Sequence, residues 1–524
     1  MSRSERALDW IHTHRWWLLA GWLVHAVMIH ALLLGIPSWD GFAYHVPPAI
    51  ELVQHHDLGL DRYWTFPFTG FVPFAELAQV PLLALLGLPG LLITGPLILF
   101  PLCVVAIYKL GRTLGEHAHS GTCAALAYIA IPMINTQPYS GYVDYLVSAA
   151  LAYLVYALVV LRGADRRAGA VVRVIIATAL VSLIKPTGLY ICGALSVLIF
   201  VRWFVERDGR RLRLVHTRVL GIMLAAMAIG AVPAMTIQII KLVHYGSPIY
   251  PFQFNLFGIP LSPGLPASEM FAQSGLADDT WREFGRNFFH AWLWPRRLPF
   301  AFYGSGFLGG GWVLVIAVAL VPAFLRSATR FEKWLGVSCV LVSVLARDFW
   351  YPRWSYTLVV AICMVIGRAL PELARAPRGR WRFWIAGGLL VLHLARPEYD
   401  LWQLRRPTSV DPRLDVIGSP WFQNNRNALE PVPDVHARFV IIEYVRNGFL
   451  VPLYGRRLTN EVAYVIPPAV VGPRCAGLRF LAARDPTALF VDELDHTRGC
   501  ERVCGVLDRR GWCRAWRLFP ADRR

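Results

Sequence analysis

The chain has 524 residues, of which 56% are hydrophobic and 16% are charged. A soluble domain carries roughly 25% charged residues, so this composition excludes a typical soluble globular protein. The net charge of +18 would suggest a nucleic-acid partner in a soluble chain, but here the basic residues lie between apolar segments. The sequence therefore predicts a membrane protein with no nucleic-acid partner.

Apolar segments at or near the length of about 17–25 residues that crosses a bilayer predict about eleven transmembrane helices. They run over Trp16–Ile36, Leu82–Leu110, Gly121–Met133, Tyr145–Leu161, Val171–Ile184, Gly188–Phe204, Val219–Val243, Trp312–Phe324, Trp334–Leu345, Tyr356–Gly367 and Phe383–Leu394. The first segment is too long and bulky for a cleaved signal peptide. We expect it to remain in the mature protein.

Basic residues follow every second predicted span. They cluster at Lys109–Arg112, Arg162–Arg173, Arg202–Arg218, Arg326–Lys333 and Arg368–Arg382. The first loop between spans, Trp39–Pro81, instead holds five acidic residues and one arginine. Because loops rich in Lys and Arg stay in the cytoplasm, the N-terminus is predicted to be cytoplasmic.

Residues 1–395 are predicted to form a transmembrane domain with two long non-cytoplasmic loops, 37–81 and 245–311. Within these loops, Ala49–His55 and Thr280–Trp292 have the helical spacing of apolar residues that is typical of amphipathic helices lying on a membrane. With an odd number of spans, residues 396–524 fall on the periplasmic side.

The polar region 396–524 alternates β-rich runs with helix-compatible segments, which predicts a small α/β domain. The β-rich runs are Phe439–Tyr444, Val462–Ile466, Ala488–Val491 and Ala515–Phe519. The same region holds Cys475, Cys500, Cys504 and Cys513, which in an oxidising compartment predict one or two disulfides of undetermined pairing. A zinc site is the competing interpretation, but the cysteines form no C-x-x-C pair.

Four ionisable residues lie at the non-cytoplasmic ends of apolar spans, where burial in the bilayer is costly. They are Asp40, Asp144, Lys185 and Arg353. The predicted topology brings all four to one face of the membrane. Two carboxylates and two cations there would supply a general base for an acceptor and charge stabilisation for a phosphate leaving group; the alternative is that each is an interfacial cap or ion pair.

Nucleotide binding has no recognisable motif in this chain. The sequence contains neither G-x-x-x-x-G-K-[ST] nor G-x-G-x-x-G after a predicted strand, the two glycine-rich patterns that cradle nucleotide phosphates. A donor whose energy lies in a lipid-linked phosphate would need neither.

Several short motifs resemble the GT-C superfamily of membrane glycosyltransferases. Within that superfamily, the similarity is to the bacterial branch related to protein O-mannosyltransferases and to the aminoarabinose transferase of lipid A. The motifs are Trp39-Asp40-Gly41-Phe42-Ala43-Tyr44-His45-Val46-Pro47 after the first span, Asp144 in the second loop, Lys185-Pro186-Thr187-Gly188, and Tyr245-Gly246-Ser247-Pro248-Ile249-Tyr250-Pro251. The resemblance extends to about Leu394.

The resemblance implies a GT-C fold, a polyprenyl-phosphate sugar as donor, and Asp40 as the catalytic residue. An acidic residue usually follows that Asp, whereas Gly41 follows it here, so the acceptor class stays open among lipid, glycan and protein. Asp144 is the second candidate for the base. Lys185 and Arg353 are expected to hold the donor phosphate.

Four further residues are candidates for the same site. Tyr44 and His45 follow Asp40 closely, and His45 could orient Asp40, touch the sugar phosphate or cap the loop. Arg296 and Arg297 could meet a lipid phosphate, either that of the donor or that of the bilayer surface, and the second is favoured.

The favoured function is an inverting glycosyltransferase in the bacterial inner membrane, acting on a periplasmic acceptor. The sequence identifies no certain cofactor and leaves open whether a divalent metal is needed. A lipid or glycolipid transporter or flippase is the first alternative, although transporters usually show repeated halves and ionisable groups at the midplane. An O-antigen ligase or polymerase is the second, and paired arginines in its large loop would be expected.

Overall fold

The structure is a computed structural model. It describes residues 2–33, 46–56, 74–87, 90, 93–131, 134–135, 137–139, 143–163, 168–208, 211–248, 255–256, 259–262, 285, 313–345, 355–404, 438–442, 457–459, 461–466 and 489–491. Several predictions fall outside these residues, namely those on Asp40, Tyr44, His45, Arg296, Arg297, Arg353, the four C-terminal cysteines and, apart from Gly285, the helix Thr280–Trp292.

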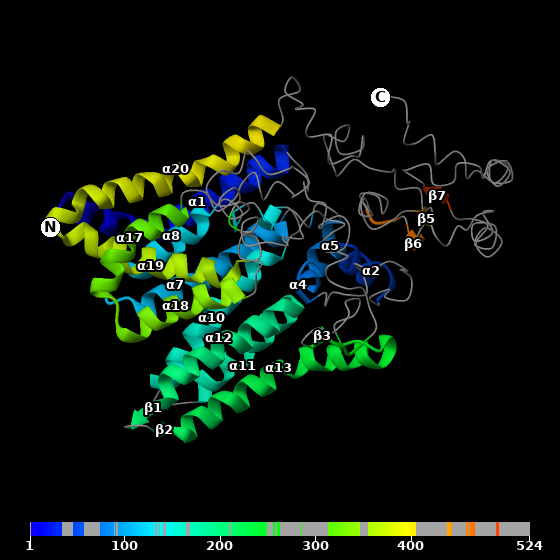
Figure 1. The fold of residues 1–524 in the computed structure, drawn as a ribbon. Coiled ribbons are helices and arrows are strands. Elements are labelled where there is room, and N and C mark those ends of the chain that lie inside the picture. The colour runs from blue at the N-terminus through cyan, green and yellow to red at the C-terminus, as the bar shows by residue number, and fades with distance from the viewer. Residues whose placement is uncertain are drawn as a thin grey trace.

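Long helices form a bundle (Figure 1), and a helix lies at each apolar segment that the sequence predicts to span the membrane. The helices are α1 (Arg3–Leu33), α7 (Phe100–Leu114), α8 (Ser120–Ala130), α10 (Asp144–Gly163), α11 (Ala168–Ile184), α12 (Pro186–Phe204), α13 (Thr217–Tyr245), α17 (Val313–Ser327), α18 (Arg330–Leu345), α19 (Tyr356–Arg375) and α20 (Arg380–Leu404). Among the described residues, five helical segments are long and apolar enough to cross a membrane. The protein is a helical membrane protein, and the total of about eleven spans stays a prediction.

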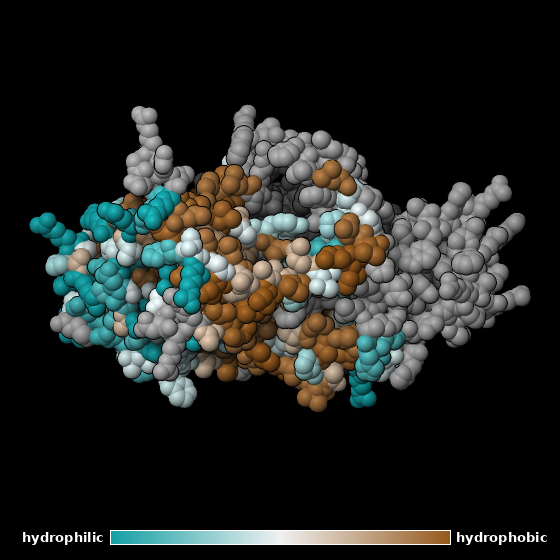
Figure 2. Space-filling view, turned by 90° about the horizontal axis from the view of Figure 1, so that it is seen from below, coloured by the Kyte–Doolittle hydropathy of each residue, from teal (hydrophilic) through white to brown (hydrophobic). Residues whose placement is uncertain are grey.

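Apolar side chains cover the middle of the described residues on the face seen in Figure 2, and hydrophilic residues gather at one end. Exposed apolar residues such as Ile176 on α11, Val197 on α12 and Ile229 on α13 belong to the helices of this bundle. Helix α19 is different, because 94% of its most apolar window is buried inside the protein. A helix that is apolar on all sides belongs in the interior, and α19 contacts α7, α8, α10, α17 and α18.

The sequence predicts one continuous span over Leu82–Leu110. This prediction is wrong, because the helix is interrupted after Leu86. Helix α5 (Val80–Leu86) ends at Gly87, which has a φ of 67°, and a π-helical segment, η3 (Thr94–Leu99), then leads into α7. Glycine tolerates this left-handed backbone without steric cost. Helix α5 therefore ends at Gly87, and η3 with α7 forms a separate helical segment rather than its continuation.

One end of the bundle joins the N-terminus to the ends of several later helices. Ser4 Oγ donates a hydrogen bond to the Ala374 carbonyl over 2.6 Å, and His119 Nε2 lies 2.6 Å from Asp9 Oδ1. A hairpin that the sequence analysis does not predict, β1 (Val205–Asp208) with β2 (Arg211–Leu214), lies near the ends of α12 and α13 (Figure 1). The predicted basic clusters thus share one end of the bundle, which we call the basic end.

The opposite end carries two short helices of the first loop, α2 (Pro47–His55) and α4 (Phe74–Leu77), with α5 beside them (Figure 1). The helix expected at Ala49–His55 is confirmed by α2. Gln54 on α2 donates through Nε2 to the Leu458 carbonyl over 2.6 Å. Leu458 of the C-terminal region therefore contacts the first loop.

The large loop and the C-terminal region contain short strands. Strands β3 (Asn255–Leu256) and β4 (Ile259–Pro260) pair in the large loop. Strands β5 (Arg438–Ile442), β6 (Glu461–Ile466) and β7 (Leu489–Val491) form a parallel sheet in the order β6-β5-β7. Three of the four predicted β-rich runs thus contain strands, while Ala515–Phe519 and the helices that would complete an α/β domain lie outside the described residues.

Candidate functional site

Asp144 opens helix α10 at the end of the bundle away from the basic end. Its carboxylate is fully buried. The N-terminus of a helix carries partial positive charge, which favours a carboxylate in the first turn. The start of α10 is therefore a favourable position for the Asp144 carboxylate.

Lys185 lies in the one-residue connection between α11 and α12. Its backbone is extended (φ −149°, ψ 146°), and Pro186 opens α12, a position where proline needs no N–H partner. A Cβ added at Gly188 would lie 2.1 Å from the Val181 carbonyl oxygen, so only glycine lets the first turn of α12 approach α11 this closely. The Lys185-Pro186-Thr187-Gly188 motif is thus the tight turn that presents Lys185.

The two side chains meet in a buried ion pair. Lys185 Nζ lies 2.5 Å from Asp144 Oδ1, and Tyr356 donates a hydrogen bond through its hydroxyl to the same oxygen over 2.8 Å. Tyr356 is the first residue of α19 and is 4% exposed. Three helix ends therefore converge on one carboxylate oxygen.

Hydrogen bonds next to Asp144 fix the chain that carries it. Tyr145 donates its backbone N–H to Gln137 Oε1 over 2.6 Å, and Tyr128 donates its hydroxyl to the Tyr145 carbonyl over 2.7 Å. Gln137 begins the 3₁₀ turn η4 (Gln137–Tyr139). A Cβ at Gly95 would lie 2.0 Å from the Pro138 carbonyl oxygen, so Gly95 in the π-helical segment allows this turn to reach α10.

The structure brings together two of the residues that the sequence singles out, Asp144 and Lys185. It adds Tyr356, for which the sequence offers only an indirect signal: this aromatic residue opens an apolar span three positions after Arg353. The predicted role of Lys185 also needs refinement, because its ammonium is already held by Asp144. Within the described part of the chain, no group of three or more His, Cys, Asp or Glu side chains could hold a metal ion.

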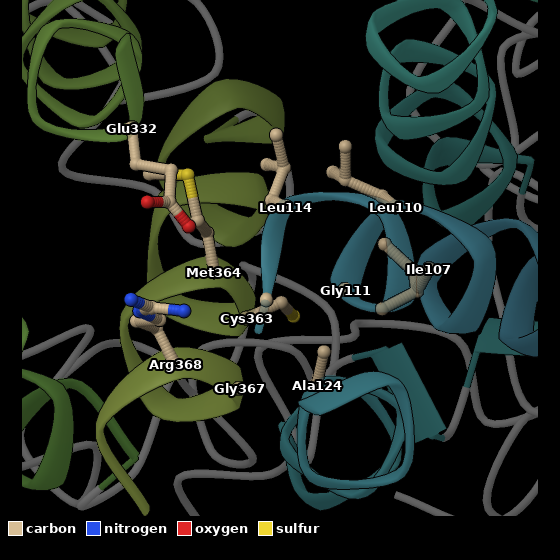
Figure 3. Close-up of a pocket in the computed structure, with 11 residues that line it drawn as sticks. Ile107, Leu110, Gly111, Leu114, Ala124, Glu332, Cys363, Met364, Gly367 and Arg368 are labelled. Atoms are coloured by element: carbon tan, nitrogen blue, oxygen red, sulfur yellow. The ribbon is translucent and has the colours of Figure 1, made fainter. Parts of the chain in front are cut away.

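The pocket in Figure 3 lies elsewhere, among α7, α8, α18 and α19 towards the basic end. Its walls are mostly apolar, with Glu332 and Arg368 as the charged members. Arg368 is twelve residues after Tyr356 on α19, which is about 18 Å along a helix. This pocket is thus separate from the Asp144–Lys185 pair.

The whole bundle is similar to a solved membrane glycosyltransferase structure. The crystal structure of ArnT from Cupriavidus metallidurans bound to undecaprenyl phosphate superposes with a TM-score of 0.50 and 13% sequence identity, covering 91% of this chain and 90% of ArnT. The chain therefore has a GT-C-type fold. The GT-C fold expected from the sequence motifs is thus confirmed.

Two other solved proteins show lower similarity to this GT-C fold. The archaeal oligosaccharyltransferase AglB from Archaeoglobus fulgidus matches with a TM-score of 0.46 and 13% identity over 91% of this chain and 70% of AglB. The arabinofuranosyltransferase AftD from Mycobacteria matches with a TM-score of 0.47 and 15% identity over 86% of this chain and 32% of AftD. No protein-family model and no curated protein matches the sequence.

Proposed function

We propose that this protein is a glycosyltransferase that moves a sugar from a polyprenyl-phosphate donor to an acceptor at the end of the bundle opposite the basic end. The observation that carries this proposal is the buried Asp144–Lys185 pair, which lies at that end of a GT-C fold. The similar ArnT structure was solved with undecaprenyl phosphate bound. In this proposal the protein resides in a bacterial inner membrane with its active site facing the periplasm.

The reaction is a single displacement at the anomeric carbon of the donor sugar. Asp40 takes the proton from the acceptor hydroxyl or amine as the acceptor atom bonds to that carbon. The bond between the anomeric carbon and the phosphate oxygen breaks, and the polyprenyl phosphate leaves with the bonding electrons. Attack opposite the leaving group inverts the configuration of the sugar.

Lys185 is assigned to the leaving phosphate, with Asp144 and Tyr356 holding it in place. An ammonium carries three N–H donors, so Lys185 can contact Asp144 and a phosphate oxygen together. Asp144 Oδ1 accepts bonds from both Lys185 and Tyr356, and its side chain is fully buried. This geometry favours Asp144 as an anchor for Lys185 and leaves Asp40 as the general base.

The remaining assignments are expectations carried from the sequence. Arg353, three residues before Tyr356, is proposed to bind the donor phosphate with Lys185, and Tyr44 and His45 to support Asp40. Arg296 and Arg297 are proposed to meet lipid phosphate. The domain 396–524 is proposed to lie beside the acceptor, and the Gln54–Leu458 hydrogen bond that ties it to the first loop supports this.

The proposal is tested with membranes that contain the protein, a radiolabelled polyprenyl-phosphate sugar and a cell-envelope acceptor fraction. We expect the label to move to the acceptor fraction with the wild-type protein and to move at least about tenfold more slowly with Lys185→Met, because a charge-assisted contact to phosphate is lost. Lys109→Met is the matched control, since Lys109 is near the basic end of α7 and should leave the rate unchanged. Label that crosses the bilayer still attached to its polyprenyl phosphate would instead identify a transporter.

A further inference from the structure

Helices α10 and α12 each carry an exposed arginine at the basic end of the bundle. Arg162 is in the last turn of α10, and Arg202 is in the last turn of α12. Both side chains are exposed, and their positive charges are close enough to repel each other. A ligand that arrives from outside the protein can therefore reach both cations.

An aromatic stack holds Arg162 beside α12, although Arg162 belongs to α10. Its guanidinium lies over the ring of Trp203, 5.0 Å from the ring centroid. Trp203 is buried, and it stacks with Phe331 of α18 at a centroid distance of 4.8 Å. A cation over an aromatic face is attracted by the electrons of the ring. Three helices thus contribute to the position of this one guanidinium.

No acidic side chain in the described part of the chain pairs with these two arginines. Neither Arg162 nor Arg202 forms an ion pair there. Glu206 is the acidic residue that follows Arg202 most closely, and it lies in β1 opposite Arg213 of β2. Two neighbouring cations without a counter-charge repel each other. An anion bound between them would remove this repulsion.

Trp203 adds an independent sign of a ligand. Its indole Nε1–H is buried and has no hydrogen-bond partner among the described residues. Trp334 on α18, in contrast, donates its Nε1–H to the Leu198 carbonyl over 2.8 Å. Buried indole N–H groups usually find an acceptor. A phosphate oxygen beside Arg162 would be an acceptor for both arginine and indole N–H groups.

The surface next to these arginines is apolar and belongs to the membrane region. Val197 and Val201 on α12 are exposed, as are Val337 and Leu341 on α18. All four lie on the site-end side of the Trp203–Phe331 contact, and residues 187–204 of α12 are long and apolar enough to span a bilayer. A phosphate at the arginines would therefore adjoin hydrocarbon, which favours a lipid head group over a free phosphate.

We propose that Arg162, Arg202 and Trp203 bind the head group of an anionic phospholipid in the membrane leaflet at the basic end. The lipid is of the cardiolipin class, because two phosphates match two arginines and basic sites between membrane helices bind such head groups. Its acyl chains lie on α12 and α18. This inference does not rest on the proposed glycosyl transfer. The alternative is that each arginine only offsets the dipole of its own helix end, which needs no lipid.

The test is a titration of the purified full-length protein in detergent, with bound lipid measured by native mass spectrometry. Cardiolipin is compared with phosphatidylglycerol, which has one phosphate, with phosphatidylethanolamine, which has no net charge, and with pyrophosphate, which has no acyl chains. We expect the wild type to bind cardiolipin most tightly. Arg162→Met and Arg202→Met should each weaken cardiolipin binding about fivefold, the usual contribution of one basic residue near anionic lipid.

Arg382→Met is the matched control variant. Arg382 also lies over a tryptophan ring, 5.2 Å from the centroid of Trp381, but it belongs to α20, on the other side of the bundle from α12 (Figure 1). We expect it to bind cardiolipin as the wild type does. Trp203→Phe keeps an aromatic face under Arg162 and should weaken binding less than Trp203→Leu. Because Arg202 is exposed, Arg202→Met keeps the test decisive if a variant of Trp203 does not fold.

The outcomes separate a lipid site from the alternatives. Wild-type affinity for cardiolipin in the double variant Arg162→Met with Arg202→Met would overturn the site and leave the helix-end role. An equal loss in Arg382→Met would show a general charge effect and would also overturn it. Pyrophosphate that binds as tightly as cardiolipin would overturn the assignment to a lipid. Lipid binding is measured without sugar transfer, so a failure of the proposed function would leave this result unchanged.

Discussion

Lys185 and Asp144 are 41 residues apart in sequence, yet their charged atoms lie 2.5 Å apart in the protein interior. The pair holds the turn between α11 and α12 against the first residue of α10. Burial of a single charge without its partner is strongly unfavourable. The ion pair therefore stabilises the contact between the α11–α12 turn and α10, and the proposed function also depends on it.

Replacing either member of the Asp144–Lys185 pair should destabilise the protein. Asp144→Asn leaves the Lys185 ammonium buried without a full counter-charge, and we expect a loss of about 3–5 kcal/mol in the free energy of unfolding. Thermal melting of the purified protein in detergent measures it. The double variant Asp144→Leu with Lys185→Met should recover much of the stability but no transfer activity, and recovery of activity as well would show that the pair is purely structural.

Tyr356 should act on Asp144 through its hydroxyl alone. Tyr356→Phe keeps the ring and removes a hydrogen bond to a charged group, which is worth about 1.5–3 kcal/mol. We expect a lower melting temperature together with a lower kcat for transfer. The control is Tyr190→Phe, because Tyr190 is 55% exposed. An equal effect of both variants would contradict a specific role of the Tyr356 hydroxyl in holding Asp144.

Arg368 should matter for stability and not for donor binding. It is 2% exposed, pairs with Glu116 over 2.9 Å, bonds the Ser327 carbonyl, and faces Glu332 beside the pocket in Figure 3. Arg368→Met should cost about 1.5–3 kcal/mol because the charged hydrogen bond to the Ser327 carbonyl is lost. Thermal melting measures the loss, and a changed KM for the donor in Arg368→Met protein would contradict the separation of the two sites.

The helices could be predicted from the sequence because a bilayer demands long apolar segments. The interruption at Gly87 was harder to foresee, because the apolar character continues through Leu88, Leu91 and Leu92 and hides the break. The β1–β2 hairpin has a recognisable signal in Asp208-Gly209 between alternating residues. The hairpin was not predicted because its charged residues were interpreted only as part of a basic cytoplasmic loop.

The candidate site could be predicted only in part. Asp144 and Lys185 are ionisable residues at the ends of apolar spans, and that position is visible in the sequence. Their contact with each other and with Tyr356 depends on how α10, α12 and α19 pack, which no local pattern encodes.

The orientation of the bundle should follow the basic clusters. We expect a fluorescent protein fused after Arg396 to stay dark and alkaline phosphatase fused there to be active, because an odd number of spans takes the chain out of the cytoplasm. A fluorescent protein fused before Met1 should be bright. Bright fluorescence from the fusion after Arg396 would place Asp144 and Lys185 on the opposite face or change the number of spans.

The most direct test of the account is single-turnover transfer by purified protein in nanodiscs loaded with a radiolabelled polyprenyl-phosphate sugar. The variant Asp40→Asn keeps the shape of the side chain and removes the proton acceptor. We predict that the wild type transfers the label and that Asp40→Asn transfers it at least about 10²-fold more slowly. Binding of undecaprenyl phosphate should be unchanged in this variant. Near-normal transfer by Asp40→Asn would contradict the assignment of the base, and an absence of transfer by the wild type with every acceptor fraction would contradict the function itself.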